Sequence, residues 1–193
     1  MQVKAIFHLA FGARSVLAFN AAVVAVFVAA FIYLKRKGIV RTDLLPVLIL
    51  ESTAYALVLG YGVSALTSQI PLSGYTGVEA DSAALRVILS IGAGVYEEII
   101  FRLILMSSLY AIATLLFPSS ISIATPILVL LSAVVFSACH HLGMGCEPFC
   151  SYKFFYRFFF GIAMSAIYIY RGLGAAVYTH AIYDVFVSLQ YGL

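Results

Sequence analysis

Long apolar runs separated by short polar segments make up most of this chain of 193 residues. A helix needs roughly 20 apolar residues to cross a hydrocarbon core about 30 Å thick, and the runs approach or exceed that length. The pattern therefore predicts an all-α, polytopic membrane bundle of six to seven transmembrane helices. The predicted spans are residues 15–34, 44–66, 82–117, 126–141, 154–170 and 175–189.

The third run, residues 82–117, leaves the number of spans open. A single helix over this run would be about 54 Å long, well beyond the core of the bilayer. The run is therefore either one long tilted helix or two pieces that break near Gly92 and Gly94. A tight turn at Gly172 and Gly174 is expected to separate the last two runs.

The polar segments indicate two regions. Residues 1–81 hold an N-terminal pair of spans and a polar loop, and residues 82–193 form the core with the candidate chemistry. The basic residues at 35–37 follow the first run, which predicts a permanent span that ends in the cytoplasm rather than a cleaved signal peptide. The loops at 67–81 and 142–153 then lie on the outer side.

Composition also indicates a membrane protein, because 64% of the residues are hydrophobic and 10% are charged, against about 25% charged in soluble domains. We expect an integral, multi-pass protein, in the cell membrane if the organism is prokaryotic. The positive residues are scattered and the net charge is +3, so the lipid bilayer is an expected partner and nucleic acid is not. Cys146 and Cys150 in the outer loop either form a disulfide or stay as two thiols, and Cys139 is expected to be a buried small apolar residue.

Glu97, Glu98 and Arg102 interrupt the third apolar run. A charge at the centre of a bilayer costs at least about 2.5 to 3.5 kcal/mol, so each of these residues needs a structural or functional reason. Glu98 and Arg102, spaced i, i+4, can pair on one helix face. Glu97 points roughly 100° away from Glu98 and has no partner in its own motif, which favours chemistry over a pair that only fixes helix packing.

Further polar residues lie in or at the end of later spans. His140 and His141 end the fourth span, and His180 and Asp184 share one face of the last span. Each group could have a purely local role. Together with Glu97 they could form one site, because a carboxylate and an imidazole can hold and deprotonate a water molecule, and a second imidazole beside another donor can stabilise an oxyanion. The set predicts peptide hydrolysis without a covalent intermediate.

Three short motifs resemble those of a known family. Glu97-Glu98-x-x-x-Arg102, Phe136-x-x-x-His140 and His180-x-x-x-Asp184 follow one another in this order, like the motifs of the CPBP family of CAAX prenyl proteases and bacteriocin-processing enzymes, also called Abi. The stretch from Phe159 to Gly172 looks like the family's segment before its last motif. The resemblance covers roughly residues 90–186.

The resemblance implies a glutamate-dependent intramembrane endopeptidase that uses neither metal nor cofactor. Glu97 would then activate water with His140, while His180 and Asp184 would line the oxyanion site. The substrate would be a membrane-associated protein or peptide cut near its C-terminus or leader, with a lipidated end or a C-terminal sorting signal as candidate features. The supporting positions of the family correspond to Glu98, Arg102 and Phe136.

Two positions depart from the family pattern. Asp184 stands where many members have Asn. An ionised Asp cannot donate to an oxyanion, so Asp184 must be protonated or must instead orient His180. An additional His141 follows His140, so either imidazole could face the site.

Three alternative functions stay open. A non-catalytic immunity or scaffold protein could have the same fold. A metal-dependent membrane protease could bind zinc through Glu, His and Asp ligands, although the chain has no HExxH motif. An ion-coupled carrier could use Glu51, Glu97 and His180 along a pathway, but such carriers have repeated halves with broken helices, and the sequence shows no such symmetry.

Overall fold

The computed structural model describes residues 25, 28–29, 32–33, 35–38, 42–67, 83–142 and 149–191. The first predicted span at 15–34 and the loop at 67–81 lie largely outside these residues. Cys146 also lies outside them, so the structure does not test whether it forms a disulfide with Cys150 or both stay as thiols. The chain divides into two compact units, and the candidate site belongs to the larger one, which comprises Leu48–His141 and Glu147–Leu193.

All regular elements in the described ranges are helices, as predicted. Four of these helical segments are long and apolar enough to cross a membrane: Thr42–Val63, Ser90–Leu116, Pro118–Cys139 and Ser151–Leu189. The predicted count of six to seven spans is therefore not confirmed. The elements are η1 (Thr42–Leu44), α2 (Leu45–Thr67), α3 (Ala83–Glu98), η2 (Ile99–Met106), α4 (Ser107–Leu116), η3 (Pro118–Ser120), α5 (Ile121–Cys139) and α6 (Ser151–Tyr191).

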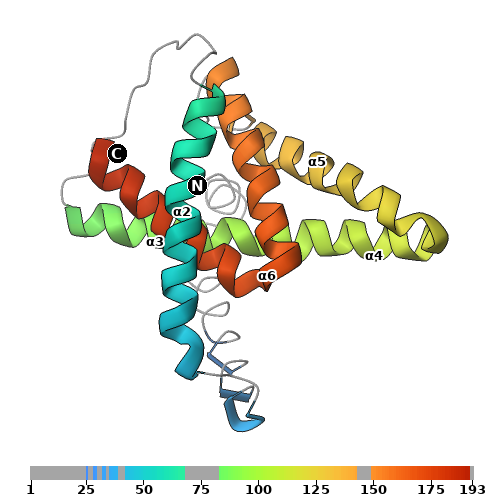
Figure 1. The fold of residues 1–193 in the computed structure, drawn as a ribbon, viewed down its shortest axis with the longest axis horizontal. Helices are drawn as coiled ribbons and strands as arrows, with labels where there is room; N and C mark the ends of the chain where they lie inside the picture. The colour runs from blue at the N-terminus through green and yellow to red at the C-terminus, as the bar shows by residue number, and fades with distance from the viewer. Residues whose placement is uncertain are drawn as a thin grey trace, which may run out of the picture. The chain divides into compact units, whose positions relative to one another are not determined.

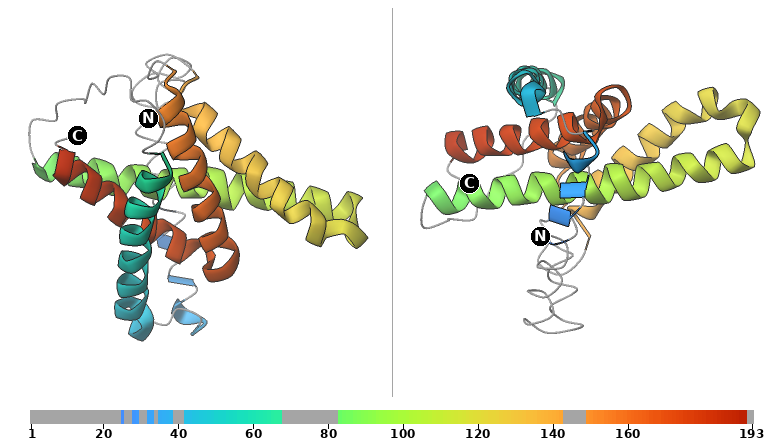
Figure 2. Two further views of the ribbon diagram at one scale, coloured as in Figure 1. Left: turned by 45° about the horizontal axis from the view of Figure 1, so that its top comes forward. Right: turned by 90° about the horizontal axis from the view of Figure 1, so that it is seen from below.

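The third apolar run forms one long helical rod rather than two broken pieces (Figure 1). α3, the π-helical segment η2 and α4 follow one another without interruption, and neither Gly92 nor Gly94 breaks the helix. Figure 2 shows the same rod extending beneath the second half of α6. The irregular geometry appears instead at η2, directly after Glu98. Such π-helical turns are frequent at functional sites.

α5 begins at Ile121, five residues before the predicted start at Pro126. Pro126 lies in the second turn of the helix, where its ring removes one backbone hydrogen bond and favours a local bend. The helix ends at Cys139, so His140 is the first residue after it. Cys139 is partly buried against the core, close to the predicted environment.

The sharp bend in α6 confirms the turn predicted at Gly172. This residue has φ 85° and ψ 175°, a conformation that glycine adopts without the steric penalty of a side chain. The helix therefore consists of two pieces, residues 151–171 and 173–191. Their ranges contain the last two predicted spans, and Figure 1 shows the change of direction between them.

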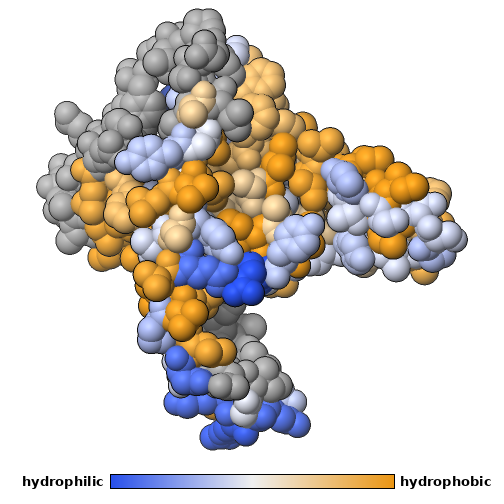
Figure 3. Space-filling model, in the orientation of Figure 1, coloured by the Kyte–Doolittle hydropathy of each residue, from blue (hydrophilic) through white to orange (hydrophobic). Residues whose placement is uncertain are grey.

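The core of the larger unit lies where the two pieces of α6 pack against α3 and α5. Many large apolar side chains on α2, α4 and α5 are instead exposed, for example Leu50 and Leu115, and Figure 3 shows the apolar surface they form. A surface of this kind fits lipid, because lipid tails do not drive apolar side chains inward as water does. The buried core consists of Ala56, Val63, Phe101, Phe136, Phe160, Met164, Ala176 and Tyr183.

Candidate active site

Two glycines bring the helices of the site close together. A Cβ at Gly94 of α3 would lie 2.8 Å from the backbone nitrogen of Ala181 in α6. A Cβ at Gly161 in the first piece of α6 would lie 3.2 Å from the Cα of Ala133 in α5. The contact at Gly94 leaves no space for a side chain, so this glycine is required for the packing, and the contact at Gly161 is tighter than most Cβ contacts. Of the two alternatives for this run, the unbroken helix is the one observed, and Gly94 makes a close helix contact beside His180.

The Glu97 carboxylate lies between two imidazole rings. Its Oε1 is 3.5 Å from His140 Nε2, and its Oε2 is 3.8 Å from His180 Nε2. Both distances exceed the usual N···O hydrogen-bond length of about 3 Å, so the carboxylate makes no close hydrogen bond to either ring. The side chains of Glu97 and His140 are 18% and 24% exposed, so this side of the site is open.

The backbone of its own helix orients the His140 ring. His140 Nδ1 lies 2.8 Å from the carbonyl oxygen of Phe136, and a carbonyl can only accept, so Nδ1 carries the proton of this hydrogen bond. In the neutral ring Nε2 is then an acceptor, and it faces another acceptor, the Glu97 carboxylate. A water molecule can donate one hydrogen to each of these groups, which gives the pair a common ligand.

Glu98 orients the second imidazole from the opposite side. His180 Nδ1 donates to Glu98 Oε1 at 2.7 Å, which directs Nε2 toward Glu97 and toward Asp184, whose Oδ2 is 3.6 Å away. The His180 ring is buried, and its edge packs against Phe160 at 4.9 Å between ring centroids. Asp184 therefore lies on the same side of the ring as the nitrogen that faces Glu97, and Glu98 holds the other nitrogen.

The ion pair predicted between Glu98 and Arg102 is present, and both side chains are fully buried. Arg102 Nε lies 3.3 Å from Glu98 Oε2, and Nη2 donates to the carbonyl oxygen of Gly161 at 3.2 Å. The guanidinium also lies over the ring of Phe136, 4.9 Å from its centroid, in a cation–π contact. Glu98 thus connects the guanidinium on one side with His180 on the other.

The structure brings the predicted site residues together from three helices. Glu97, His140, His180 and Asp184 surround one partly open space, with Glu98, Arg102 and Phe136 behind them. The adjacent imidazole of His141 is directed elsewhere and packs against the rings of Phe149 and Phe154. Within the described ranges no group of three or more His, Cys, Asp or Glu side chains has the arrangement of a metal site.

Sequence reasoning missed the hydrogen bond between Glu98 and His180. It assigned Glu98 to Arg102 alone and left Glu97 without a partner in its motif, because distances between helices are not visible in a local motif. The one available signal was Gly94, a small residue one turn before Glu98 on the same helix face, which is typical of close helix approach in membranes.

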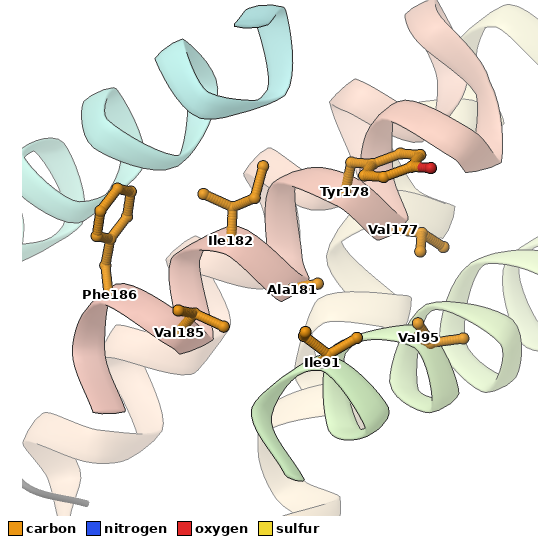
Figure 4. A pocket seen from close by; sticks show the side chains of 8 residues that line it. All are labelled: Ile91, Val95, Val177, Tyr178, Ala181, Ile182, Val185 and Phe186. Atoms are coloured by element: carbon orange, nitrogen blue, oxygen red, sulfur yellow. The ribbon is translucent and has the colours of Figure 1, made fainter. Parts of the chain in front are cut away.

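An apolar groove of about 470 Å³ lies beside the site, between α3 and the second piece of α6. Figure 4 shows side chains of both helices around it, among them Ile91, Val95 and Val185. Ala181 and Val185 line the groove and directly follow His180 and Asp184, so they project about 100° away from these residues around the helix. The groove therefore flanks the polar site and is not part of it.

A scan against protein-family models matches residues 79–186 to the model described as type II CAAX prenyl endopeptidase, Rce1-like. The match covers just over half of the chain and includes every residue of the candidate site. Neither the search of curated proteins nor the search of solved structures finds a match. Together with the four apolar helices, the family match identifies an integral, multi-pass membrane protein.

Proposed function

Since this chain belongs to the family of Rce1-like type II CAAX prenyl endopeptidases, we propose that it is a glutamate-dependent intramembrane protease whose water is activated by Glu97 and His140. The position of the Glu97 carboxylate between two imidazole rings carries this proposal. It is the only carboxylate of the motif on the open side, because Glu98 is fully buried and already pairs with Arg102 and His180.

In the proposed mechanism one water molecule donates a hydrogen bond to Glu97 and another to His140 Nε2. Its remaining lone pair faces the scissile carbonyl carbon. As the water oxygen attacks, Glu97 accepts a proton, and the carbonyl becomes a tetrahedral oxyanion. When the C–N bond breaks, the protonated Glu97 returns this proton to the departing amine. Such acid–base catalysis contributes about 10²- to 10⁴-fold.

His180 and Asp184 are the proposed donors to the oxyanion. His180 Nδ1 already donates to Glu98, so Nε2 can donate only when the ring carries both protons, and the Glu98 carboxylate balances that charge. A protonated Asp184, 3.6 Å from the same nitrogen, supplies a second donor and takes the role of the amide that many family members have there. Preformed donors of this kind stabilise the transition state because they need no reorganisation.

The proposed substrate is a membrane-associated protein or peptide, cut near its C-terminus or its leader. The apolar, span-length helices that carry the site support this class, because a membrane anchor would hold the peptide beside them. Substrates with a lipidated end and substrates with a C-terminal sorting signal are the two groups to test.

The decisive experiment uses purified protein in detergent or lipid nanodiscs with a panel of such peptides, and mass spectrometry identifies the cleaved bond. Glu97→Gln is nearly isosteric, so it should lower the cleavage rate at least about 100-fold and leave the melting temperature near that of the wild type. Retention of more than about a tenth of the activity would rule Glu97 out as the general base, since that role carries at least two orders of magnitude.

The two adjacent imidazoles provide a matched control. His140→Phe removes the nitrogen that faces Glu97 and should abolish cleavage. His141→Phe keeps an aromatic ring against Phe149 and Phe154 and should cleave at close to the wild-type rate. The opposite order would show that His141 faces the water instead.

A further inference from the structure

A second charged cluster lies at the bend of α6, outside the candidate site. Arg171 Nε lies 2.6 Å from Glu51 Oε1, and Arg171 Nη2 donates to Glu51 Oε2 at 2.7 Å. Tyr55 OH also donates to Glu51 Oε1, at 2.6 Å. The two-point contact fixes the direction of the guanidinium as well as its distance. Figure 3 shows strongly hydrophilic atoms where α2 crosses this bend, on a largely apolar surface.

The ion pair of Glu51 and Arg171 lies next to the interruption of the α6 helix at Gly172. Arg171 directly precedes Gly172, whose φ of 85° interrupts the helical backbone, so the regular ladder of hydrogen bonds is not continuous across the bend. The same segment of α2 also binds the other side of the bend, because Ser52 Oγ donates to the carbonyl oxygen of Ala175 at 3.4 Å. Side chains of α2 therefore contact α6 on both sides of the bend at Gly172.

The second piece of α6 carries His180 and Asp184, and α3 holds it near its middle. Gly94 packs against Ala181 there, and Glu98 binds His180. Ala181 lies about 12 Å along the helix from residue 173, and Asp184 lies about 4.5 Å beyond Ala181. The close contacts of this piece with α3 and with Phe160 lie at residues 180–183, so they leave the direction of its first turn less fixed. A second attachment at its beginning fixes the axis, and with it the position of Asp184 relative to Glu97.

We propose that Glu51 and Arg171 are positioning residues for the active site: their ion pair fixes the bend at Gly172 and so aligns His180 and Asp184 with Glu97. This inference rests on the proposed function, because alignment matters only if these side chains perform the reaction. The pair does not touch the reacting atoms. Its loss should therefore lower the rate of the chemical step more than it weakens substrate binding.

The test compares Glu51→Gln and Arg171→Gln with the exchanged pair Glu51→Arg/Arg171→Glu in the full-length protein in nanodiscs. Each single variant should lower kcat about 10- to 100-fold, the range expected for a displacement near 1 Å, with KM nearly unchanged. The exchanged pair should recover much of the loss. Arg171→Lys keeps the charge but not the two-point contact, so it should fall between the wild type and Arg171→Gln.

Tyr55→Phe is the matched control, because it removes one hydrogen bond to Glu51 and leaves the ion pair intact. Its kcat should stay close to that of the wild type. Single variants with a wild-type kcat, or a loss that appears only in KM, would overturn the proposal.

Hydrogen exchange measured by mass spectrometry gives a readout that does not depend on activity. Backbone amides in residues 173–184 should exchange faster in both single variants and return toward wild-type rates in the exchanged pair. Unchanged exchange would overturn the positioning role even if kcat fell. If Glu97→Gln keeps its activity, the proposed function fails, whereas the exchange data still decide whether the ion pair holds the bend.

Discussion

His180 and Glu98 share a 2.7 Å hydrogen bond across the closest contact of α3 with α6. His180 is a proposed donor to the oxyanion, and Glu98 is the second residue of the Glu-Glu motif. The bond occupies His180 Nδ1, so the ring presents Nε2 to the open space. A carboxylate in this place fixes the orientation of the imidazole and stabilises the ring that carries both protons.

Glu98→Gln should therefore reduce cleavage although Glu98 does not contact the substrate. The amide keeps the shape but carries no negative charge to balance a His180 ring that holds both protons, so the ring form that donates through Nε2 becomes less favourable. Loss of a residue that orients a functional imidazole commonly costs about 10- to 100-fold, and we expect kcat to fall by that amount. Steady-state kinetics checks this, and a variant with full kcat would refute the orienting role.

The buried pair of Glu98 and Arg102 should contribute more to stability than Glu97 does. Removing one partner of a fully buried pair strands the other charge, which costs about 3 to 5 kcal/mol. Arg102→Met should thus lower the melting temperature in detergent more than Glu97→Gln, since Glu97 is partly exposed. The double variant Glu98→Gln/Arg102→Met should lose less than the sum of its single variants. Equal losses for Arg102→Met and Glu97→Gln would contradict this.

Gly94 and Gly92 offer a matched pair of substitutions on one helix. Gly94→Ala places a methyl group 2.8 Å from the backbone of Ala181, and such overpacking costs about 1 to 3 kcal/mol. It should also lower activity, because α3 must move away from His180. Gly92→Ala meets nothing within 4 Å and should stabilise the helix by up to about 1 kcal/mol. Similar effects of both substitutions on melting and cleavage would show that helix propensity, not the close contact, controls this region.

Treatment with a strong chelator tests for a metal-dependent reaction. A zinc site needs three or four ligands at about 2.0 to 2.2 Å from the metal, and within the described residues no group of three or more His, Cys, Asp or Glu side chains has that arrangement. We expect cleavage to survive chelation and added zinc to have no effect on treated enzyme. A stoichiometric metal that is lost and restored together with activity would make Glu97 a ligand rather than a base.

The sequence patterns predicted local features of the helices better than they predicted the contacts between helices. The charges of the Glu-Glu motif, the pair at i, i+4 and the turn at Gly172 follow from local rules and agree with the structure. The bond from Glu98 to His180 and the contact of Gly94 with Ala181 join residues more than 80 positions apart. Local rules carry no information about which helices pack together, so these contacts could not be predicted.

The sequence predicted the bend at Gly172 but left open whether the helix breaks near Gly94, and the reason is physical. Glycine permits a bend at Gly172, where φ is positive, and permits close packing at Gly94, where the helix continues. The same residue type serves both purposes, and the choice depends on what lies opposite. The division at residue 81 and the two outer loops stay predictions.

The pairing of Glu98 with Arg102 also has a consequence for biogenesis. Glu97, Glu98 and Arg102 are the only charged residues between positions 90 and 116, and the chain that supplies His140 and His180 is synthesised later. When the insertion machinery first passes this segment to lipid, the i, i+4 contact can already neutralise two of the three charges within a single helix. Only Glu97 then enters the bilayer without a counterpart, so the proposed general base gains its neighbours His140 and His180 only after the later helices have been inserted.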